Sequence, residues 1–219
     1  GIIACIFAYN SRFDMALLFV LIGALLDFMD GAVARLLHVS SPLGKELDSL
    51  ADVITFGLVP GMIAFRLLAP LASVWTYLPY LRFLITRFST DRLGKFNIDE
   101  RQTTSFIGLA TPPNAIFWAS LVCWLNSIAL PTWAPWLLLA GSLLSCYLLV
   151  SEIPFFSFKS AELGKKRMII FIFGSCFILG SCSTMAITNS PITIAALAGA
   201  ICVLWYIIFN LFTLIGAKK

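Results

Sequence analysis

The sequence predicts an all-α protein: a polytopic bundle of transmembrane helices, about eight in number, with the first one truncated. The composition is 60% hydrophobic and 12% charged, and the mean hydropathy is +0.95, whereas a soluble domain carries about 25% charged residues. The apolar residues form long segments, and a helix satisfies its own backbone hydrogen bonds within a bilayer. No second domain is indicated, so residues 1–219 are expected to form a single membrane domain.

The first half of the chain contains four predicted helices. The apolar run before Tyr9 is too short to span a bilayer, which takes about 20 residues. We therefore expect it to be the end of a helix that is cut short here, together with any ligand-binding residues upstream. Pro42 and the serine before it break the chain between the second and third helices, and Gly57, Pro60 and Gly61 predict a kink or a close helix contact within the third. The predicted helices cover residues 1–9, 12–37, 43–68 and 71–90.

The second half begins with a polar segment at residues 91–102 and contains four further helices. Two consecutive prolines, Pro112 and Pro113, disturb the start of the next helix. A basic loop covers residues 159–167. The predicted helices cover residues 104–126, 136–156, 168–187 and 192–214.

The distribution of lysine and arginine predicts the orientation in the membrane. When successive loops are assigned to alternate sides, one side receives most of the positive charges, and only Arg12, Arg66 and Arg82 fall on or near the other. Because positively charged loops stay in the cytoplasm, we expect residues 27–52 to open to the cytoplasm of a prokaryotic inner or plasma membrane. The net charge of +4 is modest and does not indicate nucleic acid as a partner.

Segment 27–52 carries the main functional signal, because four aspartates, Asp27, Asp30, Asp48 and Asp52, lie in otherwise apolar sequence. On a helix the first two share one face and the last two share one face. Two antiparallel helices would therefore turn all four carboxylates toward one another. An ionised carboxylate in hydrocarbon is costly, and four of them repel unless a cation neutralises them.

Carboxylate oxygens without cysteine or clustered histidine suit hard cations such as Mg²⁺, Mn²⁺ or Ca²⁺. The alternative interpretation is that the four aspartates are salt-bridge partners between helices. Arg35 and Lys45 are the cations that lie nearest to them in sequence.

The pattern Asp-x2-Asp-Gly-x2-Ala-Arg-x8-Gly-x3-Asp-x3-Asp is complete between Asp27 and Asp52, and it resembles the signature of the CDP-alcohol phosphotransferase family. Members of that family transfer a phosphatidyl-type group from a CDP-linked lipid to an alcohol and release CMP. The resemblance implies Mg²⁺ or Mn²⁺ as cofactor, with two ions, and a homodimer in the membrane lipid. It implies Asp27, Asp30, Asp48 and Asp52 as metal ligands, Asp52 as the catalytic general base, and Asp27, Gly31, Ala34, Arg35 and Gly44 as CDP-binding residues.

A second resemblance concerns the acceptor, in the predicted cytoplasmic segment 91–112. The run from Arg92 to Asn97 and the Phe106-Ile107-Gly108 element after it are similar to the phosphatidylserine synthase branch of the family. This implies CDP-diacylglycerol and L-serine as substrates. Serine carries a carboxylate and an ammonium, so its site needs cationic and amide-type partners. The residues that supply these types are Arg92, Lys95, Asn97 and Gln102.

Two other activities are compatible with these residues. One is the same chemistry on glycerol 3-phosphate, inositol or choline, which serine-dependent release of CMP would exclude. The other is a divalent-cation transporter that uses the intramembrane carboxylates, which predicts metal flux without turnover of a CDP-linked lipid. The small residues Gly31 and Ala34 beside the acids, and the predicted cytoplasmic placement, favour the enzyme.

Overall fold

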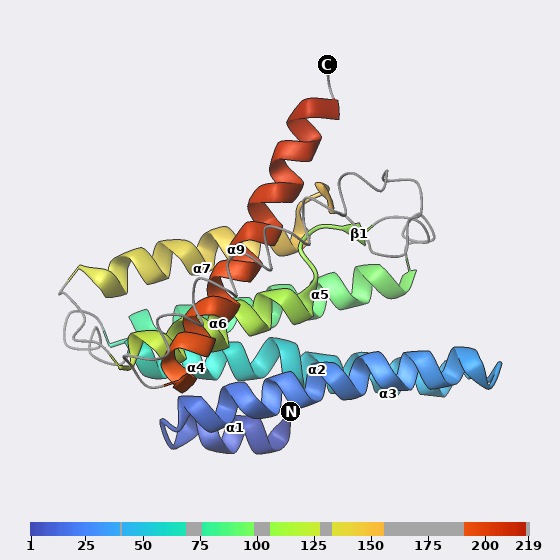
Figure 1. The fold of residues 1–219 in the computed structure, drawn as a ribbon, viewed down its shortest axis with the longest axis horizontal. Helices are drawn as coiled ribbons and strands as arrows, with labels where there is room; N and C mark the ends of the chain where they lie inside the picture. The colour runs from blue at the N-terminus through green and yellow to red at the C-terminus, as the bar shows by residue number, and fades with distance from the viewer. Residues whose placement is uncertain (40, 69–75, 99–105, 128–132, 156–190, 218–219) are drawn as a thin grey trace.

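Helices make up almost all of the described structure (Figure 1). The computed structural model describes residues 1–39, 41–68, 76–98, 106–127, 133–155 and 191–217. Its helices are α1 (Ile2–Tyr9), α2 (Phe13–Leu36), α3 (Pro42–Asp52), the π-helix η1 (Val53–Leu58), α4 (Val59–Leu68), the 3₁₀-helix η3 (Leu78–Phe83), α5 (Leu84–Ile98), α6 (Thr111–Leu125), α7 (Ala134–Val150) and α9 (Pro191–Ala217). The short strands β1 (Phe106–Ile107) and β2 (Pro154–Phe155) pair antiparallel. The helical fold class is confirmed, and the number of about eight helices stays a prediction.

α2 and the helical run from α3 to α4 form an antiparallel hairpin. Ser41 begins the return, because its Oγ accepts a hydrogen bond from the backbone N–H of Gly44 at 3.0 Å and Pro42 occupies the first helical position. At the other end, Arg66 donates to Ser11 Oγ at 2.9 Å, so the start of α2 and the end of α4 lie together. Both arms, Phe13–Leu36 and Pro42–Arg66, are long and apolar enough to cross a membrane.

The third predicted helix departs from regular geometry, but the irregularity is not at Pro60, which lies inside α4. A π-helix instead follows Asp52 directly. The predicted close helix contact is confirmed. A Cβ added to Gly57 would lie 3.3 Å from Ser89 Cβ, and one added to Gly61 would lie 2.5 Å from Thr86 Oγ1. Glycine at these two positions therefore lets α5 approach closely.

The main core lies where α1, α2, η1, α4, α6 and α9 meet, and α6 packs against both α2 and α9. Many of its fully buried side chains are small, which allows helices to approach closely. They include Ala4, Ala8, Ala16, Ala115, Ala119 and Ala196. Figure 1 shows α9 crossing the direction of the other helices.

Three predicted boundaries were wrong. The fourth helix does not end at residue 90, because α5 continues to Ile98 and makes the first part of the polar segment helical. α6 begins at Thr111 rather than at residue 104, because prolines are tolerated in the first turn of a helix and not inside it. α7 ends at Val150 rather than at residue 156. The predicted helix 168–187 and the basic loop 159–167 lie outside the described residues.

Candidate active site

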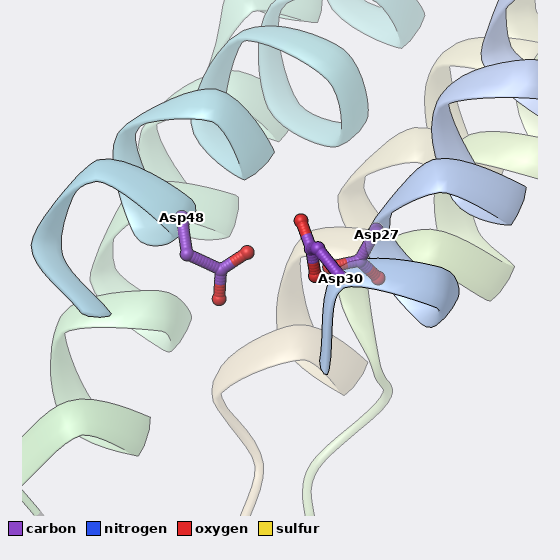
Figure 2. Close-up of side chains that lie close together, drawn as sticks. All are labelled: Asp27, Asp30 and Asp48. Atoms are coloured by element: carbon purple, nitrogen blue, oxygen red, sulfur yellow. The ribbon is translucent and has the colours of Figure 1, made fainter. Parts of the chain in front are cut away.

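Three carboxylates from two helices meet at the end of the α2–α3 hairpin. Asp27 and Asp30 are one helical turn apart on α2, and Asp48 lies on α3. Each offers an oxygen atom, and these oxygens lie within 4.8 Å of one another. Figure 2 shows Asp48 pointing across the gap between the helices toward Asp27 and Asp30. The facing arrangement predicted from the sequence spacing is therefore present for these three residues.

Asp52 lies one turn beyond Asp48 and is half-buried. It is outside the group of three but lines the same pocket, which has a volume of about 720 Å³. The size is in the range of roughly 300–1,000 Å³ that is typical of small-molecule sites. One pocket thus contains all four predicted acids, of which Asp27 and Asp52 are half-buried and Asp30 and Asp48 are exposed.

None of the four aspartates forms a salt bridge that the structure shows among the described residues. Within the described residues the salt bridges are Arg12–Asp14 and Arg87–Asp91, and neither involves the four acids. Arg35 and Lys45, the nearest cations in sequence, therefore do not pair with these aspartates in the described part of the chain. Three convergent carboxylates that form no salt bridge with another described residue fit a divalent cation. Hard cations take oxygen ligands, and Mg²⁺ binds through carboxylates together with substrate phosphates.

Only some of the residues predicted to bind CDP line the pocket. Gly31 and Arg35 line the pocket beside Asp27, and a Cβ added to Gly31 would meet only the Arg35 guanidinium, at 3.5 Å. Ala34 is exposed and is not part of the described pocket lining. Gly44 lies in the first turn of α3, where its nearest neighbour is the Ser41 hydroxyl rather than another helix.

Of the residues predicted to bind serine, again only some line the pocket. Arg92 and Asn97 line the pocket, whereas Lys95 is exposed and does not. The reason is that residues 92–97 are helical. Positions 92, 93, 96 and 97 share a face, and position 95 lies on another. The fourth candidate, Gln102, lies outside the described residues.

Asn97 joins α5 to α3 at the mouth of the pocket. Its side-chain amide donates to Ser49 Oγ at 2.8 Å, and its backbone carbonyl accepts from Lys45 Nζ at 3.0 Å. Lys45 and Ser49 both line the pocket as well. The end of α5 is therefore fixed relative to the helix that carries Asp48 and Asp52.

Arg92 is the buried cation of the pocket, at 6% exposure. Its guanidinium lies 5.5 Å from the centroid of the Phe96 ring. Burial lowers the pKa of Arg92 to about 10, partly offset by Tyr206 and Asp52, so the side chain stays protonated at neutral pH. The pocket thus has an acidic side on α2 and α3 and a positive charge on α5.

Two further elements supply pocket residues that the sequence did not reveal. Thr111 begins α6, and Tyr206 lies on α9; both line the pocket and are buried. Thr111 lies inside segment 91–112, which the sequence indicated as the acceptor segment without identifying Thr111 as a binding residue. Tyr206 lies in an apolar helix remote in sequence from every motif, so no sequence pattern could have found it.

The fold and the site define a class of protein. It is a helical protein in which two helices of the described part are long and apolar enough to cross a membrane, and the end of their hairpin places a carboxylate cluster in a ligand-sized pocket. The family model for CDP-alcohol phosphatidyltransferase matches residues 1–147. The chain belongs to the CDP-alcohol phosphatidyltransferase family. The match includes the whole hairpin and most of α7, but not α9.

Relatives with a curated name agree with this family. The CDP-diacylglycerol–serine O-phosphatidyltransferase of Bacillus subtilis is 35% identical over 163 residues, which cover 73% of this chain and 84% of that protein. The enzyme of the same name from Helicobacter pylori is 35% identical over 126 residues, covering 53% of this chain and 49% of the relative. The one from Saccharomyces cerevisiae is 55% identical over 49 residues, covering 22% of this chain and 18% of the relative. The matched region thus spans about half of the Helicobacter protein.

Proposed function

We propose that this chain transfers a phosphatidyl group from CDP-diacylglycerol to L-serine, giving phosphatidylserine and CMP. The observation that carries the proposal is that the acids of α2 and α3 and a buried arginine on α5 line one and the same pocket. Family membership and the shared name of relatives from bacteria and yeast support it.

The carboxylates would hold the cofactor, which we propose to be two ions of Mg²⁺ or Mn²⁺. Asp27, Asp30 and Asp48 converge, and Asp52 lies in the same pocket. When bound there, divalent ions offset the charge of a pyrophosphate and stabilise the CMP that leaves. Gly31 and Arg35 would contact the CDP, and Ala34 and Gly44 would act only through the shape of the hairpin end.

The transfer exchanges one phosphorus–oxygen bond for another. The serine hydroxyl gives its proton to Asp52, which acts as general base, and its oxygen forms a bond to the phosphorus on the lipid side of the pyrophosphate. The bond from that phosphorus to the bridging oxygen breaks, and CMP leaves with this oxygen. The bonds formed and broken overall are the same whether the transfer is one direct displacement or two successive displacements through a covalent intermediate.

The setting of the reaction is proposed from the sequence pattern. Residues 1–219 form a single membrane domain of about eight helices in a prokaryotic inner or plasma membrane. Segments 27–52 and 91–112 face the cytoplasm, where serine enters and CMP leaves. Membrane lipids surround the apolar helices, and the chain forms a homodimer.

The proposal is tested by an acceptor screen with labelled CDP-diacylglycerol and purified protein. We expect CMP release with L-serine, and not with glycerol 3-phosphate, inositol or choline. Asp52→Asn should reduce this release by at least about 100-fold, the typical contribution of a general base, while the thermal unfolding temperature stays within a few degrees of wild type. Release with another alcohol and not with serine would exclude the proposed acceptor. Metal flux in liposomes without CMP release would indicate the transporter.

A further inference from the structure

The first turn of α6 is held firmly at the wall of the pocket. Gly108 donates its backbone N–H to the carbonyl of Ile153 at 2.8 Å, and Leu109 donates to the carbonyl of Leu148 at 2.8 Å. Gly108 has φ +77°, and a Cβ there would lie 2.6 Å from the carbonyl oxygen of Leu149. Only glycine fits such a position. The short link 108–110 thus fixes the start of α6 against the end of α7.

Thr111, the first residue of α6, lines the pocket and carries a buried hydroxyl. Its side chain is 0% exposed, and within the described part of the chain its Oγ1 has no hydrogen-bond partner. α6 also lacks a side-chain cap, because Ala110 precedes it. The start of a helix carries a partial positive charge, and a buried hydroxyl without a partner is costly. Both features favour an anionic ligand that accepts a hydrogen bond at this point.

Two residues from other helices add to the same side of the pocket. Arg92 on α5 is buried and protonated, and Tyr206 on α9 is 9% exposed. Both line the pocket with Thr111, and they interact with each other electrostatically. α9 packs on α6 and lies outside the region matched by the family model. It therefore contributes a wall that the matched motif does not supply.

We infer that Thr111, the first turn of α6, Arg92 and Tyr206 form a subsite for the carboxylate of an amino-acid acceptor. This inference rests on the proposed function and adds to it the group that is recognised. A carboxylate is repelled by the acids of α2 and α3 and attracted by Arg92 and the start of α6. Arg92 also interacts with Asp52. A short molecule can therefore place its carboxylate at this subsite and its hydroxyl at Asp52.

The subsite is tested with three threonine variants of the full-length protein. Thr111→Val removes the hydroxyl and keeps the shape, Thr111→Ser keeps the hydroxyl, and Thr90→Val removes a hydroxyl that is exposed and bonded within α5. We expect Thr111→Val to raise the apparent KM for L-serine by about tenfold, the size expected for a lost hydrogen bond to a charged group. The KM for CDP-diacylglycerol should not change, and Thr111→Ser and Thr90→Val should behave as wild type.

A competitor without a carboxylate separates recognition from a general effect on the pocket. Serinol has the ammonium and hydroxyl groups of serine but a second alcohol in place of the carboxylate. Its inhibition of serine turnover should be the same in wild type and Thr111→Val. Tyr206→Phe should raise the KM for serine in the same direction, again without changing the KM for CDP-diacylglycerol.

The outcomes distinguish this inference from the proposed function. If wild type releases no CMP with serine, the proposed function fails. If wild type uses serine and Thr111→Val has an unchanged serine KM, the subsite is wrong. An equal loss of serine and serinol binding would also overturn it. Should Thr111→Val fail to fold, the serine KM of Tyr206→Phe decides in its place.

Discussion

At the scale of single residues, the environment separates acids that look alike in the sequence. Asp14 and Asp91 each pair with an arginine on the same helix or at its start. Asp27, Asp30 and Asp48 instead converge from two helices and have no bonded cation among the described residues. Surface ion pairs contribute little free energy, whereas convergent carboxylates repel one another and gain from a shared cation. The two kinds of acid should therefore respond differently to substitution.

Asp48→Asn should weaken divalent-ion binding. The substitution removes the α3 member of the cluster and keeps its shape, so we expect the dissociation constant for Mn²⁺ to rise by roughly tenfold or more. Titration followed by electron paramagnetic resonance of free Mn²⁺ measures it without turnover. The matched control is Asp91→Asn, which removes an acid bound to Arg87 outside the pocket lining. Equal Mn²⁺ affinity in wild type and Asp48→Asn would remove that aspartate from the metal site.

The placement of single residues was predicted correctly from the sequence where their spacing along a helix determines which side chains share a face. The 3- and 4-residue spacings of a helix correctly bring Asp27 and Asp30 to one face, opposite Asp48. Lys95 could not be placed in the same way, because the segment 91–98 was predicted to be a polar segment after the helix and is instead part of α5. Tyr206 could not be found at all, since only the packing of α9 on α6 brings it to the pocket.

At the scale of elements, close contacts between helices depend on single small residues. Gly61 on α4 faces Thr86 on α5, and the Thr86 hydroxyl donates to the carbonyl of Gly57 at 3.0 Å. A methyl group at residue 61 would lie 2.5 Å from that hydroxyl oxygen. It would displace the hydroxyl and break this bond between helices. The contact positions α5, and with it Arg92 and Asn97, relative to the hairpin.

Gly61→Ala should therefore destabilise the protein by about 1–3 kcal/mol, the usual cost of overpacking a helix contact. The free energy of unfolding in detergent measures this. Gly94→Ala on α5 is the matched control, because a Cβ there meets nothing within 4 Å; alanine in a helix should leave stability unchanged or raise it by up to about 1 kcal/mol. The double variant Gly61→Ala/Thr86→Ala should lose less than the sum of its two single variants. Full additivity would show that the two side chains do not collide.

Element boundaries were predicted least well where proline and polar residues compete with helix formation. The hairpin arms were located to within a residue or two, because their apolar runs and the Ser41-Pro42 start are strong signals. The start of α6 was misplaced because the apolar run begins before Pro112 and Pro113, yet the helix can begin only at the first turn that contains them. The pairing of β1 with β2 links residues 106 and 155, and no local pattern predicts so distant a partner.

At the scale of the whole molecule, the hairpin separates two ends. One end carries the acidic pocket and the turn between α2 and α3. At the other, Arg66 bonds to Ser11 and its guanidinium lies 5.9 Å from the centroid of the Tyr9 ring. The α3–α4 arm is long enough to cross a bilayer. The two ends are therefore expected on opposite sides of the membrane, with the pocket on the cytoplasmic side.

Cysteine labelling in whole cells tests this orientation. Leu43 beside the pocket and Tyr77 before η3 are 70% and 68% exposed. We expect Tyr77→Cys to react with a membrane-impermeant maleimide in intact spheroplasts, and Leu43→Cys to react only after permeabilisation. The parent protein, with its native cysteines, gives the background. The reverse pattern would place the pocket outside the cytoplasm.

The π-helix after Asp52 changes which face of the α3–α4 arm the following side chains occupy. In an uninterrupted α-helix, positions 56, 59 and 63 would continue the row that begins at Asp48 and Asp52. Those positions are Phe56, Val59 and Ile63, all almost completely buried in the core. The wider turn of η1 accommodates about one extra residue, which rotates the following helix by about 100° relative to the acids. The carboxylates can therefore line the pocket, while Phe56, Val59 and Ile63 of the same arm pack in the hydrophobic core.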